Sequence, residues 1–249
     1  MLRPLHLLAA LALALASHAS QAGEFSVSPV RLDFAGVARS QLLAVTNMGD
    51  KPARFLVRGA NWTMTEAGGV ELSDDDSLLV FPASFTVAAK ATQNVRVGTA
   101  QRAGDTEKTW RVVLEELPDA NGAGSSGATI AVLSVISVPV FMPPVAPRKG
   151  LDVAWHGATG TAAKLQIANT GNVHQMLAGV SVTSMRGEDI VQQVQQEGWY
   201  ILPGKNRVFS FAGAGNWCAA GVTRFELKAT DRDGQVAGRQ TIDAREACR

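Results

Sequence analysis

The chain has 249 residues, of which 46% are hydrophobic and 18% are charged, with 23 Lys and Arg against 22 Asp and Glu. This near-neutral balance provides no strongly basic surface, so neither nucleic acid nor an anionic membrane is an expected partner. The length is sufficient for two domains of ordinary size.

Residues 1–22 have the pattern of a secretory signal peptide. Arg3 supplies the positive start, and residues 7–16 form an apolar core that is too short to span a bilayer. Ser20 and Ala22 belong to a small-residue cleavage site, so we expect the mature chain to begin near Gly23 and to keep 227 residues. No later stretch has the length and apolarity of a membrane helix. We therefore expect a soluble exported protein with no membrane insertion.

From residue 24 onward the sequence consists of short segments with strand character, separated by turn residues. Pro29 is expected to mark an edge or a switch of pairing partner. Phe55 and Val57 alternate with charged neighbours, as in an antiparallel strand with one exposed face. The acidic, turn-rich segment 66–77 is expected to be a loop. The first series of expected strands comprises residues 25–34, 41–47, 53–62, 78–81, 84–87, 92–98 and 110–117. This number and spacing are typical of an immunoglobulin-like sandwich.

Residues 129–144 contain no charged side chain and are rich in β-branched residues, which favours a strand. Both alternating sets of side chains are mostly apolar, so both faces need cover. One interpretation is a central strand that is buried on both sides. The other is an edge strand whose outer face another molecule covers. Pro139 favours the edge, because proline cannot donate to a ladder, and the chain offers no helices to cover a parallel sheet.

Pro143, Pro144 and Pro147 indicate a stiff hinge, and a second series of β segments follows it. The sequence therefore predicts an all-β protein with two immunoglobulin-like sandwich domains, at residues 23–146 and 147–249, joined by a proline-rich hinge. No convincing amphipathic helix is present. The expected strands of the second domain are residues 151–155, 163–169, 177–184, 193–200, 206–212, 223–230 and 235–243.

Cys218 and Cys248 are the only cysteines, and in an exported protein they are expected to form a disulfide, with two free thiols as the alternative. The bridge would close a loop of about 30 residues and stabilise the fold by roughly 3–4 kcal/mol. His156 and His174, the histidines left after signal removal, have no metal-site spacing. No nucleophile motif, redox C-x-x-C pair or phosphate cradle occurs. We expect no enzyme activity, no metal and no cofactor.

Several segments together resemble one protein family. Five segments are similar to segments of PapD-like periplasmic chaperones, and in particular to those of the archaic or non-classical branch. They are SPVRLDF at residues 28–34, the segments 78–98 and 110–118, SVPVFMPP at residues 137–144 and NTGNVH at residues 169–174. These chaperones assemble pili and fimbriae. The resemblance covers nearly the whole mature chain and preserves the domain order. It implies two immunoglobulin-like domains in an L shape.

The resemblance also implies a mechanism and partners. In that family the late strand of the first domain is lent to a pilin subunit that lacks one strand, and the subunit then passes to an outer-membrane usher. Backbone pairing and alternate apolar side chains supply the affinity. The expected partners are therefore pilin or fimbrial subunits and the usher, in the periplasm, and a free edge could also pair with a second copy of the chain.

We expect the lent face to comprise Ile130, Val132, Ser134 and Ile136. The opposite set, Ala131, Leu133 and Val135, is the rival, because a shift of one residue exchanges the two faces of a strand. A third possibility is that all these side chains belong to the internal core.

The resemblance matches Arg31 to an arginine that binds the subunit's terminal carboxylate, a role that suits a guanidinium fork. The lysine that accompanies it in the family is missing, and Pro139 stands in its place. Lys90, Arg96 and Arg148 are candidate substitutes.

Arg96 and Glu116 match positions of a charge network that holds the two domains at a fixed angle in relatives, which Asp231 or Asp233 would complete. Two other function classes remain open. One is a structural or adhesive two-domain fibre protein, and the other is a secreted hydrolase, for which the sequence shows no catalytic cluster.

Overall fold

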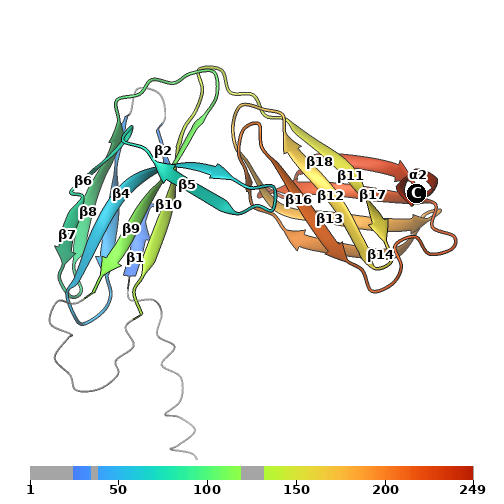
Figure 1. Ribbon diagram of the computed structural model, residues 1–249, viewed down its shortest axis with the longest axis horizontal. Coiled ribbons are helices and arrows are strands. Elements are labelled where there is room, and N and C mark those ends of the chain that lie inside the picture. Colours follow the sequence, from blue (N-terminus) through green and yellow to red (C-terminus); the bar gives the residue numbers. More distant parts are fainter. Residues whose placement is uncertain (1–24, 35–38, 119–131, 249) are drawn as a thin grey trace, which may run out of the picture.

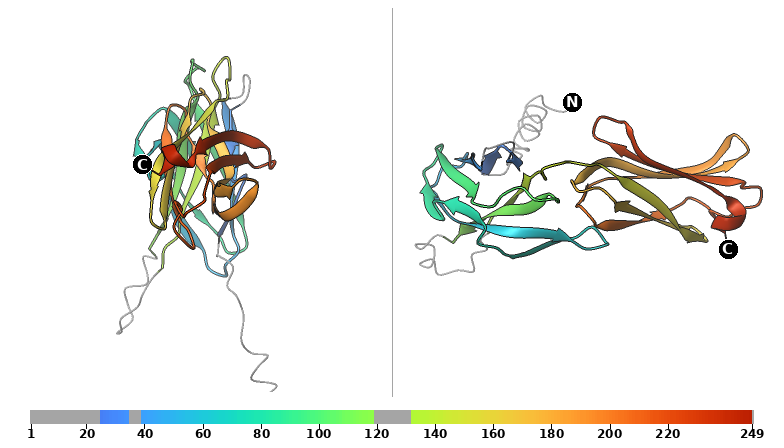
Figure 2. Two further views of the ribbon diagram at one scale, coloured as in Figure 1. Left: turned by 90° about the vertical axis from the view of Figure 1, so that its right-hand side faces the viewer. Right: turned by 90° about the horizontal axis from the view of Figure 1, so that it is seen from above.

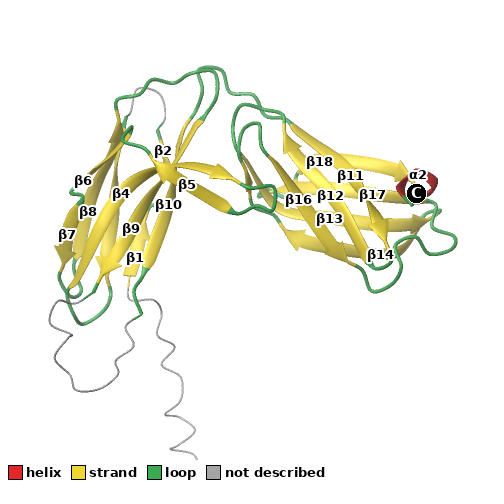
Figure 3. Ribbon diagram, viewed as in Figure 1, coloured by secondary structure: helices red, strands yellow, loops and turns green. Residues whose placement is uncertain are grey.

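The computed structural model of the protein describes residues 25–34, 39–118 and 132–248. Two β-sandwiches follow one another along the chain, and their strands run in clearly different directions, so the molecule is bent (Figure 1). The view from above in Figure 2 shows the two domains end to end. Nearly every element is a strand (Figure 3), which confirms the predicted all-β fold with two sandwich domains.

The first domain packs two sheets face to face. One sheet has the order β1-β3-β8-β6, and the other has the order β2-β10-β9-β4-β5, with β7 also paired to β4. Their bounds are β1 Phe25–Ser28, β2 Leu32–Asp33, β3 Ser40–Asn47, β4 Ala53–Met64, β5 Val70–Asp74, β6 Leu78–Phe81, β7 Ser84–Val87, β8 Thr92–Thr99, β9 Lys108–Leu117 and β10 Val135–Met142. Phe55 and Val57 face the shared core, as their alternation predicts.

The first expected strand divides at the proline. β1 pairs with β3 in one sheet, whereas β2 pairs with β10 in the other, so the chain changes sheets between Ser28 and Leu32. The position of Pro29 in this crossing confirms the switch of pairing that the sequence indicates.

Segment 66–77 is not the simple loop that its composition predicts. It contains β5, which pairs with the end of β4 from Ala60 to Met64. Every residue of β5 is exposed, so the strand has no buried face and leaves no apolar alternation in the sequence. Backbone pairing to a long neighbour holds it in place instead.

The second domain also has two sheets, with the orders β11-β12-β16 and β14-β13-β17-β18, and β15 pairs with β13. Its elements are β11 Leu151–Thr159, β12 Ala162–Asn169, β13 Gln175–Arg186, β14 Asp189–Glu197, β15 Tyr200–Ile201, β16 Asn206–Ala212, β17 Arg224–Asp231, β18 Val236–Asp243 and the short helix α2 Ala244–Ala247. The expected strand at 193–200 is therefore two strands. A separate core of buried apolar side chains fills this sandwich.

Cys218 and Cys248 form a disulfide, as predicted, with their Cα atoms 5.8 Å apart. The bond ties the end of the chain, just beyond α2, to the loop between β16 and β17. We expect replacement of both cysteines by serine to lower the free energy of unfolding of the second domain by roughly 3 kcal/mol, because the open loop regains chain entropy. Denaturant unfolding of the double variant against the wild-type chain measures this loss. Equal midpoints and slopes would contradict it.

A third apolar cluster joins the two domains. Trp62, Met64 and Phe141 from the first domain pack against Tyr200 and Leu202 from the second. The tip of the β4–β5 hairpin reaches across as well, and the carbonyl of Glu66 accepts a 2.8 Å hydrogen bond from the backbone N–H of Val208. The turn that leads into β5, a strand that the sequence does not reveal, is thus part of a domain contact.

Polar contacts complete this interface. The Oε2 atom of Glu107 accepts hydrogen bonds from the backbone N–H of His174 at 2.7 Å and lies 2.8 Å from its Nδ1. The His174 ring stacks on Phe141 with 3.8 Å between ring centroids. Across the hinge, the Asn172 side chain donates to the carbonyls of Asp105 and Ala146. These contacts set the relative position of the domains and therefore the walls of any cleft between them.

Candidate functional site

β10 lies near one edge of its sheet. It pairs with β9 along its whole length, but on its other side β2 reaches only Val140 and Phe141. Among the residues that the structure describes, no strand pairs with this side from Val135 to Pro139. β10 is therefore an edge strand up to Pro139, although its residues from Val138 onward are buried, and the proline sits where the pairing with β2 begins.

The strand begins later than the composition predicts. Its first residue is Val135, and Val132 and Leu133 precede it as exposed chain without strand geometry. The partner strand explains this limit, because β9 ends at Leu117 and is followed by Pro118. On the N-terminal side of Val135, among the residues that the structure describes, one more backbone hydrogen bond extends the ladder, from the N–H of Glu116 to the carbonyl of Ser134.

The two faces of β10 have different environments. Ile136 packs on the core of the first domain, in which Val138 and Val140 are buried. The other row starts with Val135, which is 68% exposed, and Ser137, which is also exposed, and it ends at Pro139, which is buried but lines a cleft. This second row is the one that a partner molecule can reach.

The four residues of the expected lent face, Ile130, Val132, Ser134 and Ile136, therefore do not share one environment. Ile130 lies outside the described residues, as does Ala131 of the rival set. The Val132 side chain is 89% exposed, whereas the Ile136 side chain packs against the core of the first domain. The backbone N–H of Ser134 is bound by the Glu116 carboxylate at 2.9 Å. Within β10 the accessible apolar side chain, Val135, belongs to the rival set.

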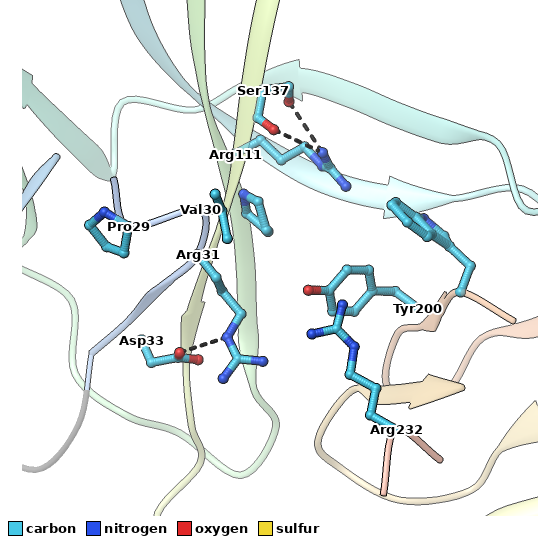
Figure 4. A pocket seen from close by; sticks show the side chains of 10 residues that line it. Pro29, Val30, Arg31, Asp33, Arg111, Ser137, Tyr200 and Arg232 are labelled. Atoms are coloured by element: carbon cyan, nitrogen blue, oxygen red, sulfur yellow. Dashed lines mark hydrogen bonds and ion pairs between the residues drawn. The ribbon is translucent and has the colours of Figure 1, made fainter. Parts of the chain in front are cut away.

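At the far end of the exposed row lies a cleft of about 490 Å³ between the domains. The first domain contributes residues from the β1–β2 turn, β2, β9 and β10. The second domain contributes residues just before and within β15 and from the β17–β18 turn. Figure 4 shows these side chains converging from both domains. The lining residues are Pro29, Val30, Arg31, Asp33, Arg111, Ser137, Pro139, Trp199, Tyr200 and Arg232.

Arg31, the expected carboxylate anchor, lines this cleft. Its Nε donates to Oδ2 of Asp33 at 2.7 Å, and both side chains are about two-fifths exposed. Burial alone would lower the pKa of Arg31. The hydrogen bond to Asp33 and the charge of Asp33, with a smaller contribution from Tyr200, outweigh burial, so the pKa of Arg31 is raised. An exposed ion pair of this kind contributes about 1 kcal/mol or less, so a stronger anion can replace Asp33.

Arg111 is a second cation in the cleft that the sequence does not single out. It lies on β9 directly opposite Pro139 of β10, so its side chain starts beside the position at which the resemblance leads us to expect a lysine. Arg111 is only 6% exposed, and its guanidinium carbon is 4.0 Å from the centre of the Trp62 ring.

The guanidinium of Arg111 is incompletely paired. Nη1 makes long contacts of 3.3 and 3.4 Å with the hydroxyl and carbonyl of Ser137, while Nε and Nη2 are buried without a hydrogen-bond partner. Desolvation by burial lowers the pKa of Arg111, partly offset by the charge interaction with Tyr200. A buried charge without a counter-ion is unfavourable, and an anion in the cleft would supply one.

The expected substitutes for the lysine lie elsewhere. Lys90 pairs with Asp50 at 2.9 Å, Arg96 contacts the hydroxyl of Ser40, and Arg148 uses its backbone N–H to bind Asn172. None of the three lines the cleft. The signal that could have identified Arg111 is its place in the run WRVVL, in which the neighbouring side chains are all buried. A lone cation in such a run usually has a specific partner.

Arg96 and Glu116 do not meet in a charge network. No ion pair among the described residues joins them, since Arg96 lies on β8 beside Ser40 and Glu116 caps the start of β10. Asp231 instead binds the backbone N–H groups of Asp233 and Gln235 in the β17–β18 turn. The side-chain pair that the structure does place between the domains is Glu107–His174. His174 ends the NTGNVH segment that carries the family resemblance, but the sequence alone assigns it no role in a domain contact.

The cleft is lined by three arginines and one carboxylate, that of Asp33. In the described part of the chain, no group of three or more His, Cys, Asp or Glu side chains is arranged to hold a metal ion. Within those same residues, no helix has the length and apolarity needed to cross a membrane.

Comparisons with known proteins agree with this architecture. Residues 24–147 match the family described as "Pili and flagellar-assembly chaperone, PapD N-terminal domain". A curated relative, the "Probable fimbrial chaperone EcpB" of Escherichia coli O157:H7, is 28% identical over 145 residues. That match spans 57% of this chain and 60% of the relative.

Solved structures share the fold across most of the chain. A chain in the CsuC–CsuE chaperone–tip subunit pre-assembly complex, from archaic chaperone-usher Csu pili of Acinetobacter baumannii, superposes with a TM-score of 0.60 at 13% identity, covering 89% of this chain and 98% of the other. A chain in the Salmonella enterica SafA pilin–SafB chaperone complex gives 0.53 at 17% identity, covering 90% and 98%. The family is one of assembly chaperones and not of enzymes. The chain therefore belongs to the PapD-like family of pilus and fimbrial assembly chaperones.

Proposed function

We propose that this protein is a periplasmic chaperone that captures pilin-like subunits along the free edge of β10 and passes them to an outer-membrane usher. The observation that carries the proposal is the continuity of the site. An unpaired strand edge with an exposed apolar side chain leads directly into a cleft lined by arginines. A subunit strand that pairs with this edge would bring its chain end into that cleft.

The lent side chains are those of the exposed row. Val135 and Leu133 are exposed and alternate along the chain, whereas Ile136 is used by the domain core. Each Val or Leu that enters a partner's core contributes roughly 1.5–3 kcal/mol, so a few in register hold a subunit without covalent chemistry. The unpaired edge is also open to a second copy of the chain.

Arg31 and Arg111 hold the subunit's terminal carboxylate. Arg31 exchanges Asp33 for the incoming carboxylate, and Arg111 gains the counter-ion that it lacks in the free protein. Arg31 and Arg111 line the same cleft together with Tyr200, which supports a shared role for the two guanidinium groups. Charge-assisted hydrogen bonds from two arginines to one carboxylate are strong and directional.

Periplasmic co-expression of the tagged chain with a pilin-like subunit encoded beside its gene tests the proposal. We expect a one-to-one complex with the wild-type chain and about a tenfold weaker one with Arg31→Gln, because a partly buried charge pair is lost. Arg102→Gln, which changes an exposed loop arginine away from the cleft, is the control. If the wild-type chain captured no subunit and instead polymerised with itself, the fibre-protein alternative would replace this proposal.

A further inference from the structure

The cleft contains more positive charge than one carboxylate requires. It is lined by three arginines and one acidic residue, Asp33, which pairs with Arg31. Neither Arg111 nor Arg232 forms an ion pair with any residue in the described ranges. One terminal carboxylate bound by Arg31 and Arg111 would still leave Arg232 without an anion.

Arg232 comes from the second domain. It lies in the turn between β17 and β18, and in Figure 4 its guanidinium group lies beside the Tyr200 ring and faces Arg31 across the cleft. The aspartates that flank it in the sequence do not line the cleft. Of these, Asp231 is already bound to backbone N–H groups of its own turn.

The size of the cleft leaves room for more than a chain end. Its volume of about 490 Å³ is in the range of sites that enclose a small molecule, and exceeds that of a single carboxylate. Its lining includes apolar side chains, such as those of Pro139 and Trp199, as well as polar ones, such as those of Ser137 and Tyr200. The last side chains of a bound strand can therefore lie inside it, next to Arg232.

We propose that Arg232 makes the cleft selective for a partner whose end carries two negative charges, the terminal carboxylate and an acidic side chain among its last residues. This inference rests on the proposed function, in which a subunit's carboxyl terminus enters the cleft. Arg31 and Arg111, which belong to the first domain, bind the partner's terminal carboxylate. Arg232, which belongs to the second domain, binds the partner's acidic side chain. The second domain thereby contributes to the choice of partner as well as to the shape of the cleft.

Fluorescent peptides with one alternating Val/Thr sequence and four different ends test the inference on the full mature chain. The ends are Glu with a free carboxylate, Gln with a free carboxylate, Glu amide and Gln amide. We expect the Glu carboxylate peptide to bind about three- to fivefold more tightly than the Gln carboxylate peptide at low salt, as for a partly exposed ion pair. The difference should shrink as salt screens it.

Arg232→Gln should remove this difference and leave the affinity for the Gln carboxylate peptide unchanged. Arg239→Gln, which changes an exposed arginine on β18 outside the cleft, should retain the difference. Equal binding of the two carboxylate peptides by the wild-type chain, or a Glu preference that survives Arg232→Gln, would overturn the inference while the proposed function stands. Equal binding of carboxylates and amides, or no peptide binding at all, would overturn the carboxylate anchor and this inference together.

Discussion

Val135→Asp is expected to abolish subunit capture while leaving the chaperone folded. The Val135 side chain is 68% exposed, so the free protein loses little when it changes. In a complex the same position would lie inside the subunit's core. The loss of the apolar side chain costs roughly 1.5–3 kcal/mol, and a buried carboxylate without a partner adds several kcal/mol more. We expect at least about a hundredfold weaker binding, measured by titration of the purified chaperone with a strand-deficient subunit.

Ile190→Asp is the matched control, because Ile190 is also an exposed apolar residue on an edge strand, β14, but belongs to the second domain. It should leave capture unchanged. Ile136→Asp should instead destabilise the first domain, because Ile136 packs on its core. If Val135→Asp bound subunits normally and Val132→Asp did not, the lent face would be the set that contains Ile130 and Val132.

Arg111→Met is expected to change stability and binding in opposite directions. Methionine keeps much of the side-chain length and the contact with Trp62, but removes a buried charge that has two unpaired donors. The free protein should therefore be as stable as the wild type or more stable. Subunit binding should weaken by about 2 kcal/mol or more, about thirtyfold, because the carboxylate loses a desolvated cation.

Thermal unfolding of the free chaperone and titration with the subunit measure the two effects separately. Arg111→Lys retains the charge but not the planar fork, so it should restore only part of the affinity. A destabilised Arg111→Met protein would indicate that Arg111 holds the domain interface together. Unchanged binding by a stable Arg111→Met protein would leave Arg31 as the anchor without this second cation.

Local patterns in the sequence were sufficient to predict the architecture. Alternation such as that of Phe55 and Val57 identifies a strand with one buried face, because side chains of a strand point to opposite sides in turn. Pro29 marks the change of sheets, since proline cannot continue a ladder on both sides. Two cysteines in an exported chain leave only one possible intramolecular bridge, Cys218–Cys248. Arg31 was found through resemblance, and the structure places it in the cleft.

Features that depend on distant parts of the chain could not be predicted in this way. The exposed face of β10 follows from its register with β9, and a shift of one residue exchanges the two faces. β5 has no buried side, so its sequence carries no periodic signal. Arg111 and Arg232 are 121 positions apart in the numbering, and only the packing of the two domains brings them to one cleft. Local sequence determines which segments become strands, whereas long-range pairing and domain packing decide which side chains meet.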